Sequence, residues 1–218
     1  MKSMIIPVLM GLLSISFFAV NSDVEQTNVA KIKASLQSVQ AMVQVDNVRQ
    51  HTSQKVLQII NRYNPNMPLN MKKEIVAEIN KMSLKYANLD VDLICATITH
   101  ESGRTWKPNV VSNAGAMGLM QIMPHTGEWL TKYEGIKWTS AEEILFNPIY
   151  NIRLGSRYLS ALIESYDLEG GLAAYNGGRK IAELWLENNK ADGILWAETK
   201  NYIPYVLKLY DEYKSFTL

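Results

Sequence analysis

Apolar residues recur at helical spacing along almost the whole chain, and the alternating pattern typical of strands is nearly absent. From residue 28 to residue 62 the spacings alternate between three and four residues, which places the apolar side chains on one narrow stripe. The stripe is formed by Val29, Ile32, Leu36, Val39 and Val43. The pattern predicts a long helix that ends near Tyr63. A stripe this narrow suits packing on the rest of the chain or on a partner, and both stay open.

Two prolines in NPNMPLN, residues 64–70, interrupt this helix and predict a boundary. We therefore divide the chain into an N-terminal helical extension, 23–68, and a main domain, 69–218. The main domain contains further helical patterns that begin at capping residues, namely Asp90, Asn147 before a proline, and Thr199. The expected helices cover 70–86, 90–102, 147–166, 170–176, 179–188 and 199–213. Together they predict a compact all-α domain.

The first residues form a separate feature, because Lys2 is followed by an uncharged apolar stretch and then by the polar NSDVEQTN. A short basic start, an apolar centre and small residues near the end are typical of a secretory signal peptide. We expect a signal peptide over 1–22, cleaved after Ser22, and hence an exported protein. The alternative is an uncleaved membrane anchor, since the stretch lies at the lower limit of a span. No cysteine lies near this boundary, which excludes a bacterial lipoprotein anchor.

Composition narrows the function classes. The chain has 218 residues, of which 47% are hydrophobic and 20% charged, as in ordinary folded proteins. The net charge is +1 and no basic stripe is present, which argues against a nucleic-acid partner. The only cysteine, Cys95, lies within the apolar run VDLICATI, so no internal disulfide forms and a buried structural role is expected.

Glu101 is the first candidate for chemistry. Successive helix residues turn by about 100°, so Ile94 and Glu101 point within about 20° of each other, on the buried side of their helix. Burial and the negative end of the helix dipole both raise the pKa of a carboxyl group. A carboxyl that stays protonated near neutral pH suits a general acid. Position alone also allows an ordinary ion pair with Arg104 or Lys107.

Four segments that follow one another along the chain decide between these interpretations. They are LDVDLICATITHES, ending at Glu101-Ser102; GAMGLMQIMP, 115–124, with Ser112 ahead of it; NPIYNIRLGSRYL, with Asn147, Asn151 and Gly155; and AYNGG, 174–178, followed by ETKNYIPYV, 198–206. With these segments in this order, the chain resembles the soluble lytic murein transglycosylases over roughly residues 86–213. The resemblance implies a lysozyme-like domain of the goose type.

The resemblance also implies an activity, the cleavage of the β-1,4 bond between N-acetylmuramic acid and N-acetylglucosamine in peptidoglycan without water. Glu101 then protonates the glycosidic oxygen and afterwards acts as base on the C6 hydroxyl of the muramoyl residue, which closes a 1,6-anhydro ring. Most glycosidases need two carboxylates. Apart from the helix that leads to Glu101, the matched motifs contain one other acid, Glu198, and we assign it to the fold, positioning Tyr202 or a backbone amide. A mechanism in which the substrate's own groups assist and attack needs one carboxylate.

Further residues of the matched segments have chemistry that suits a sugar cleft. Amides donate and accept hydrogen bonds to hydroxyl and N-acetyl groups, and aromatic or thioether side chains offer apolar surface to sugar faces. By the resemblance, a serine polarises the C6 or acetamido region and a tyrosine lies near Glu101. The predicted substrate-binding residues are Ser112, Met120, Gln121, Tyr175, Asn176 and Tyr202.

Each of these residues also has a purely structural interpretation. Met120 can be core, and Tyr175 and Asn176 can simply end a helix. We assign Asn147 to capping and Gly155 to tight helix packing. The interval from Glu101 to Gln121 is two residues longer than the resemblance implies, and the extra length lies in GRTWKPNVV.

Other signals are weak. His100-Glu101 does not begin a zinc motif, because position 104 is arginine, and no cofactor is implied. Two alternatives to the transglycosylase stay open: a goose-type lysozyme that hydrolyses the same bond, and a non-cleaving peptidoglycan-binding component of a secretion apparatus. We expect a periplasmic monomer that acts on glycan strands, with a protein partner possible through 23–68, or an inner-membrane anchor instead.

Overall fold

The computed structural model describes the backbone of residues 5–216 and the side chains of 28, 31–44 and 47–216. The predicted signal peptide, 1–22, therefore lies outside the residues whose side chains are described. The chain separates into two units, Met1–Arg49 and Gln50–Leu218. The helices are α1 (Ile5–Tyr63), α2 (Leu69–Lys85), α3 (Val91–Glu101), α4 (Pro124–Glu134), α5 (Ala141–Leu145), α6 (Pro148–Gly177), α7 (Arg179–Glu187) and α8 (Ala197–Lys214). Over the described residues there are no strands, only two isolated β-bridges, which confirms the all-α class.

The first unit contains the N-terminal part of α1, where four residues of the predicted apolar stripe are exposed; the fifth, Val29, lies outside the residues whose side chains are described. The side chains of Ile32, Leu36, Val39 and Val43 each expose more than half of their surface. Among the described residues, none of the helices combines the length and the hydrophobicity needed to cross a membrane. The stripe is therefore available to another helix or to another part of the chain.

The second unit begins at Gln50, earlier than the predicted boundary at residue 68, because the last turns of α1 belong to its core. Val56 and Ile60 are fully buried there. The Lys55 ammonium lies 3.0 Å from the Asp92 carboxylate and donates to the Tyr213 carbonyl at 3.0 Å, which joins α1 to α3 and α8. The proposed division into 23–68 and 69–218 stays a prediction about folding units.

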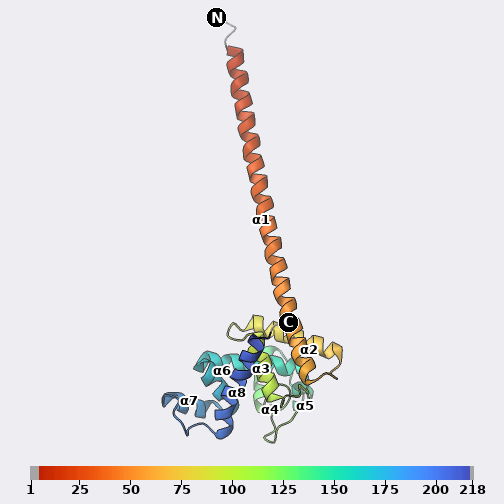
Figure 1. The fold of residues 1–218 in the computed structure, drawn as a ribbon, viewed down its shortest axis with the longest axis vertical. Helices are drawn as coiled ribbons and strands as arrows, with labels where there is room; N and C mark the ends of the chain where they lie inside the picture. Colours follow the sequence, from red (N-terminus) through yellow and green to blue (C-terminus); the bar gives the residue numbers. More distant parts are fainter. Residues whose placement is uncertain (1–4, 217–218) are drawn as a thin grey trace. The chain divides into compact units, whose positions relative to one another are not determined.

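Helix α3 lies in the interior of the second unit, packed on α8 and α2, and α6 packs on α2, α4, α7 and α8 (Figure 1). The apolar side of α3, including Ile94, Cys95 and Ile98, is fully buried. The Asp90 carboxylate accepts from the Leu93 amide at 2.8 Å, which confirms the predicted cap. Cys95 is a buried filler, as expected, and its burial raises the pKa of the thiol well above its ordinary value.

Helix α6 contains a kink that explains why the sequence predicted two helices in this region. Asp167 has φ 66° and ψ −177°, and its carboxylate accepts from the Gly170 amide at 2.8 Å, restarting the helix. At the other end, the Asn147 side chain accepts from the amides of Ile149 and Tyr150, which confirms this cap. The cap predicted at Thr199 is wrong: α8 already begins at Ala197, and the Thr199 hydroxyl bonds elsewhere.

Candidate active site

Glu101 is the last residue of α3 and lies at the edge of the core, where its side chain is half-buried. Burial raises the pKa of Glu101 to about 8, the nearby Tyr202 hydroxyl lowers it, and the negative charge of Glu198 raises it. The carboxyl is therefore mostly protonated at pH 7. This environment is what the helix geometry of the sequence predicted, and it lets Glu101 give a proton to a bound group.

Tyr202 is the residue of α8 that lies beside Glu101. Its side chain is fully buried, and its hydroxyl has no hydrogen-bond partner among the described residues. The hydroxyl nevertheless lies close enough to the Glu101 carboxyl to affect its pKa. A buried hydroxyl beside a carboxyl stabilises the anion that forms when the proton leaves. The ring is further held by His100, whose imidazole stands edge-on to it with 4.7 Å between the centroids.

Gly115–Ile122 forms the wall predicted to face Glu101, and one buried amide holds it in place. Asn151 of α6 donates to the carbonyls of Met117 and Leu145, each at 2.9 Å, and accepts from the Met120 amide at 2.7 Å. Gly118 has φ +81°, and a Cβ there would lie 2.3 Å from the Asn151 side-chain nitrogen. Glycine is therefore required at this contact, and Asn151 satisfies backbone groups that would otherwise be buried without partners.

Gln121 lies in this wall with its backbone in the left-handed region, at φ 47°. Its amide nitrogen donates to the Gly118 carbonyl at 2.8 Å and to the Val110 carbonyl at 3.2 Å. These bonds fix the side chain and leave the amide oxygen without a partner among the described residues. An unusual backbone conformation that persists in a fixed loop is often found at functional sites.

Met120 and Tyr175 are placed differently from each other. Met120 is fully buried, and a Cβ on Gly155 would lie 2.5 Å from its sulfur, which supports core packing. Gly155 is thus a tight contact as predicted, but with a residue of a turn and not with another helix. The Met120 side chain thus offers no surface to a ligand. Tyr175 donates to the Met120 carbonyl at 2.7 Å, and burial and the charge of Glu101 raise the pKa of its hydroxyl well above the ordinary value. Tyr175 therefore joins α6 to the wall beside Glu101.

Asn176 and Ser112 are both engaged in local hydrogen bonds. The side-chain amide oxygen of Asn176 accepts from the Thr199 hydroxyl at 2.7 Å, which fixes α6 against the start of α8. The Ser112 hydroxyl oxygen accepts from the Ala116 amide at 3.0 Å and stabilises the turn at the beginning of the wall. Both side chains keep a hydrogen-bond donor for which no described residue is an acceptor.

The structure thus places Tyr202 and Tyr175 near the Glu101 carboxyl. Gln121 and Asn176 follow Met120 and Tyr175 in the sequence, and their hydrogen bonds, like that of Ser112, are to other residues than Glu101. Sequence reasoning gave no role to Asn151, although an amide between the apolar residues of a helical face is a signal for a buried polar contact. The assignment of Glu198 is corrected: its side chain is exposed, forms no hydrogen bond with the described residues, and acts on Glu101 through its charge.

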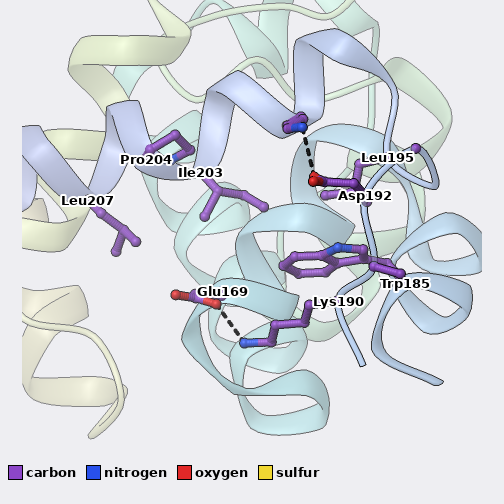
Figure 2. Close-up of a pocket in the computed structure, with 11 residues that line it drawn as sticks. Glu169, Trp185, Lys190, Asp192, Leu195, Ile203, Pro204 and Leu207 are labelled. Carbon is purple, nitrogen blue, oxygen red and sulfur yellow. Dashed lines mark hydrogen bonds and ion pairs between the residues drawn. The ribbon is translucent and has the colours of Figure 1, made fainter. Parts of the chain in front are cut away.

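A separate pocket of 240 Å³ lies between α7, α8 and residues 188–196 (Figure 2). Trp185 forms one wall, and the charged side chains are paired, Lys190 with Glu169 at 2.6 Å and Lys200 with Asp192 at 2.8 Å. None of the predicted site residues lines this pocket. It is therefore distinct from the Glu101 site.

Comparison with known proteins gives a matching family. Residues 78–195, more than half of the chain, match the family described as Transglycosylase SLT domain. The soluble lytic murein transglycosylase of Escherichia coli K12 is 35% identical over 121 residues, which cover 51% of this chain and 19% of that protein. The membrane-bound lytic murein transglycosylase C of Photorhabdus laumondii is 37% identical over 110 residues, covering 46% of this chain and 30% of that protein.

Solved structures agree with these sequence matches. A lytic transglycosylase Slt from Pseudomonas aeruginosa, solved as an inactive glutamate-to-glutamine mutant, superposes with a TM-score of 0.56 at 29% identity. The superposition covers 63% of this chain and 23% of that one. The chain therefore spans less than a third of the length of these relatives. The family match over residues 78–195 includes Glu101, Ser112, Met120, Gln121, Tyr175 and Asn176 and ends before Tyr202.

Proposed function

We propose, from the premise that this chain belongs to the transglycosylase SLT domain family, that it is a peptidoglycan lytic transglycosylase. The bond cleaved joins N-acetylmuramic acid to N-acetylglucosamine, and the product carries a 1,6-anhydromuramoyl end. The observation that carries this proposal is Glu101, a carboxyl held protonated by burial beside the hydroxyls of Tyr202 and Tyr175. The inactivity of the Pseudomonas glutamate-to-glutamine mutant supports assigning the chemistry to one glutamate.

In the proposed reaction, the Glu101 carboxyl donates its proton to the glycosidic oxygen as the bond to the muramoyl C1 breaks. The resulting carboxylate then takes the proton of the muramoyl C6 hydroxyl, whose oxygen bonds to C1. Glu101 thus regains from the C6 hydroxyl the one proton that it donated. The enzyme returns to its starting state, and no water molecule takes part. The Tyr202 hydroxyl stabilises the carboxylate between the two steps, because a hydrogen bond to the charged form favours that form.

We assign the remaining predicted residues to substrate binding. The free amide oxygen of Gln121 accepts from sugar groups, and the unused donors of Asn176 and Ser112 reach N-acetyl or hydroxyl oxygens. Tyr175 stabilises the wall through its hydrogen bond to the Met120 carbonyl, and its ring packs on the substrate. Met120 supports the wall from the core side.

Hydrolysis of the same bond is the second candidate, and Glu198 is the observation that favours it. A hydrolase needs a second carboxylate as nucleophile or as base for water. Glu198 is close enough to raise the pKa of Glu101 and is exposed. In the transglycosylase mechanism its charge only keeps Glu101 protonated.

Mass spectrometry of digested peptidoglycan separates the two reactions. We expect muropeptides that end in 1,6-anhydromuramic acid, lighter by one water molecule than reducing ends. Digestion in water labelled with oxygen-18 provides the control, since a transglycosylase transfers no solvent oxygen to C1. Reducing ends that carry the label would instead establish hydrolysis.

Tyr202 and Glu198 act on the pKa of Glu101 in opposite directions, so substitutions of the two residues should shift the alkaline limb of the pH–rate profile in opposite directions. Activity requires protonated Glu101, so in the wild type it falls above a pH of about 8. Tyr202→Phe removes a group that lowers the pKa of Glu101, so the limb moves to higher pH. Glu198→Gln removes a charge that raises this pKa, so the limb moves to lower pH. Shifts in the same direction, or none, would contradict the proposed placement of the two groups.

Location and partners extend the proposal. A signal peptide over 1–22 and glycan strands as substrate support export to the periplasm, and an uncleaved anchor in the inner membrane is the alternative. Binding of a protein partner through 23–68 stays a prediction, which the exposed side chains of Ile32, Leu36, Val39 and Val43 support.

A further inference from the structure

Arg104 follows the Glu101 site by three residues and is held in an unusual position. Its φ is +61°, in the left-handed region, and its side chain is exposed. The guanidinium donates to the Tyr205 hydroxyl at 2.8 Å. It also lies over the ring of Tyr205, at 5.9 Å, and over the ring of Tyr63, at 5.7 Å. Two rings and a hydrogen bond thus orient the guanidinium before any ligand binds.

Arg104 differs from the other arginines of the second unit in having no acidic partner. Those arginines lie within 4.0 Å of a glutamate: Arg62, Arg153, Arg157 and Arg179. None of the described residues forms an ion pair with Arg104. A guanidinium oriented in this way presents its remaining N–H groups to an anion, and its planar geometry suits a carboxylate.

A continuous row of rings joins Arg104 to the Glu101 site. The His100 imidazole lies between Tyr202, at 4.7 Å between centroids, and Tyr205, at 5.1 Å. Tyr202 adjoins the Glu101 carboxyl, and Tyr205 holds Arg104. Tyr202 is buried, whereas Tyr205 and Arg104 are exposed, so Arg104 lies at the exposed end of this row. A group that joins a sugar at Glu101 to Arg104 must therefore extend beyond the sugar ring, as a peptide of three residues, about 10 Å long when extended, does.

We propose that Arg104 binds a carboxylate of the peptidoglycan substrate and so makes the enzyme prefer strands that carry their peptides. This inference rests on the proposed function and specifies the substrate further. Muramic acid bears a lactyl group, to which a short peptide with free carboxylates is amide-linked. The carboxylate that pairs with Arg104 belongs either to the peptide or, where the peptide has been removed, to the lactyl group itself.

The test compares Arg104→Gln with the wild type on three forms of the same glycan. The first carries native peptides, the second carries peptides whose carboxylates have been converted to amides with carbodiimide and methylamine, and the third has been stripped of peptides by an amidase. On native strands we expect KM to rise about fivefold with kcat unchanged, as for an exposed ion pair that binds ground and transition states equally. On the amidated strands the two proteins should have equal KM.

The stripped strands identify the source of the carboxylate. Equal KM on these strands shows that Arg104 binds the peptide carboxylate alone, and a rise in KM shows that it also binds the lactyl carboxylate that the amidase exposes. Arg104→Lys should recover part of the loss, because a charge remains but the planar geometry does not. Lys81→Gln, which removes an exposed charge on α2, controls for net charge and should leave KM unchanged on every substrate.

Two results would overturn the inference. One is an equal KM of Arg104→Gln and the wild type on native strands. The other is an equal rise on native and amidated strands, which would indicate a structural effect of the substitution. Activity of the wild type on the amidated strands shows separately whether the proposed function holds, so a failure of the inference is distinguishable from a failure of the function.

Discussion

Glu101→Gln is expected to lower peptidoglycan cleavage about a thousandfold, within the range typical for the loss of a general acid or base. Glutamine has nearly the same shape as protonated glutamate but cannot give up a proton. Because wild-type Glu101 is protonated at neutral pH, the substitution changes little else in the half-buried site. Release of soluble muropeptides from purified cell walls, followed over time, measures the effect.

Stability measurements provide the internal control for this variant. The folded-state pKa of Glu101 lies above its unfolded value, so the favourable contribution of the protonated group is complete below about pH 4.5 and is lost as pH rises from there to about 8. Glutamine avoids that loss, and Glu101→Gln should unfold at the same temperature as the wild type at about pH 4 and at a higher one at about pH 9. Glu164→Gln, an exposed substitution on α6, should keep full activity. Clearing by Glu101→Gln within tenfold of the wild type would refute the catalytic role.

Gly118→Ala is expected to destabilise the protein by about 3 kcal/mol or more and to abolish activity with it. A Cβ there would lie 2.2 Å from the Leu145 carbonyl and 2.3 Å from the Asn151 side-chain nitrogen, so backbone and buried amide must both move. Asn151 then loses its bonds to the wall. For a domain of this size, each kcal/mol lowers Tm by about 2–4 °C, so thermal unfolding followed by circular dichroism measures the change.

Gly115→Ala is the matched control for this prediction. Gly115 also has a positive φ, +87°, but no atom lies within 4 Å of a Cβ built on it. Only the conformational cost remains, about 1–2 kcal/mol. If the two variants lost the same stability, the close contact between Gly118 and Asn151 would not be what fixes the wall.

The helices were predictable because their signals are local. The stripe of α1, the caps at Asp90 and Asn147 and the break near Asp167 follow from spacing and from short-range hydrogen bonds. The sequence did not show that the last turns of α1 pack into the second unit, because burial of Val56 and Ile60 depends on distant partners. Thr199 was taken for a cap because its bond to Asn176 joins two helices that are separate in the sequence.

The site was predictable in its chemistry and less so in its contacts. Helix geometry gave a buried Glu101, and the four matched segments indicated its neighbours. Met120 was predicted to contact the substrate, but its side chain is buried in the core. The sequence could not decide this, since an apolar residue beside Gln121 is equally consistent with a ligand contact and with the core. The row from Tyr202 to Arg104 depends on α8 packing against α3, and no short-range pattern contains that information.

The proposed mechanism depends above all on the pKa of Glu101, because its first step needs a carboxyl that is protonated at neutral pH. Carbon-13 NMR of protein labelled at the glutamate side-chain carboxyls follows each group through a pH titration, and Glu101→Gln identifies the signal that belongs to Glu101. We predict a midpoint of about 8 for this signal. A midpoint near 4.5, the ordinary value for glutamate, would contradict the account.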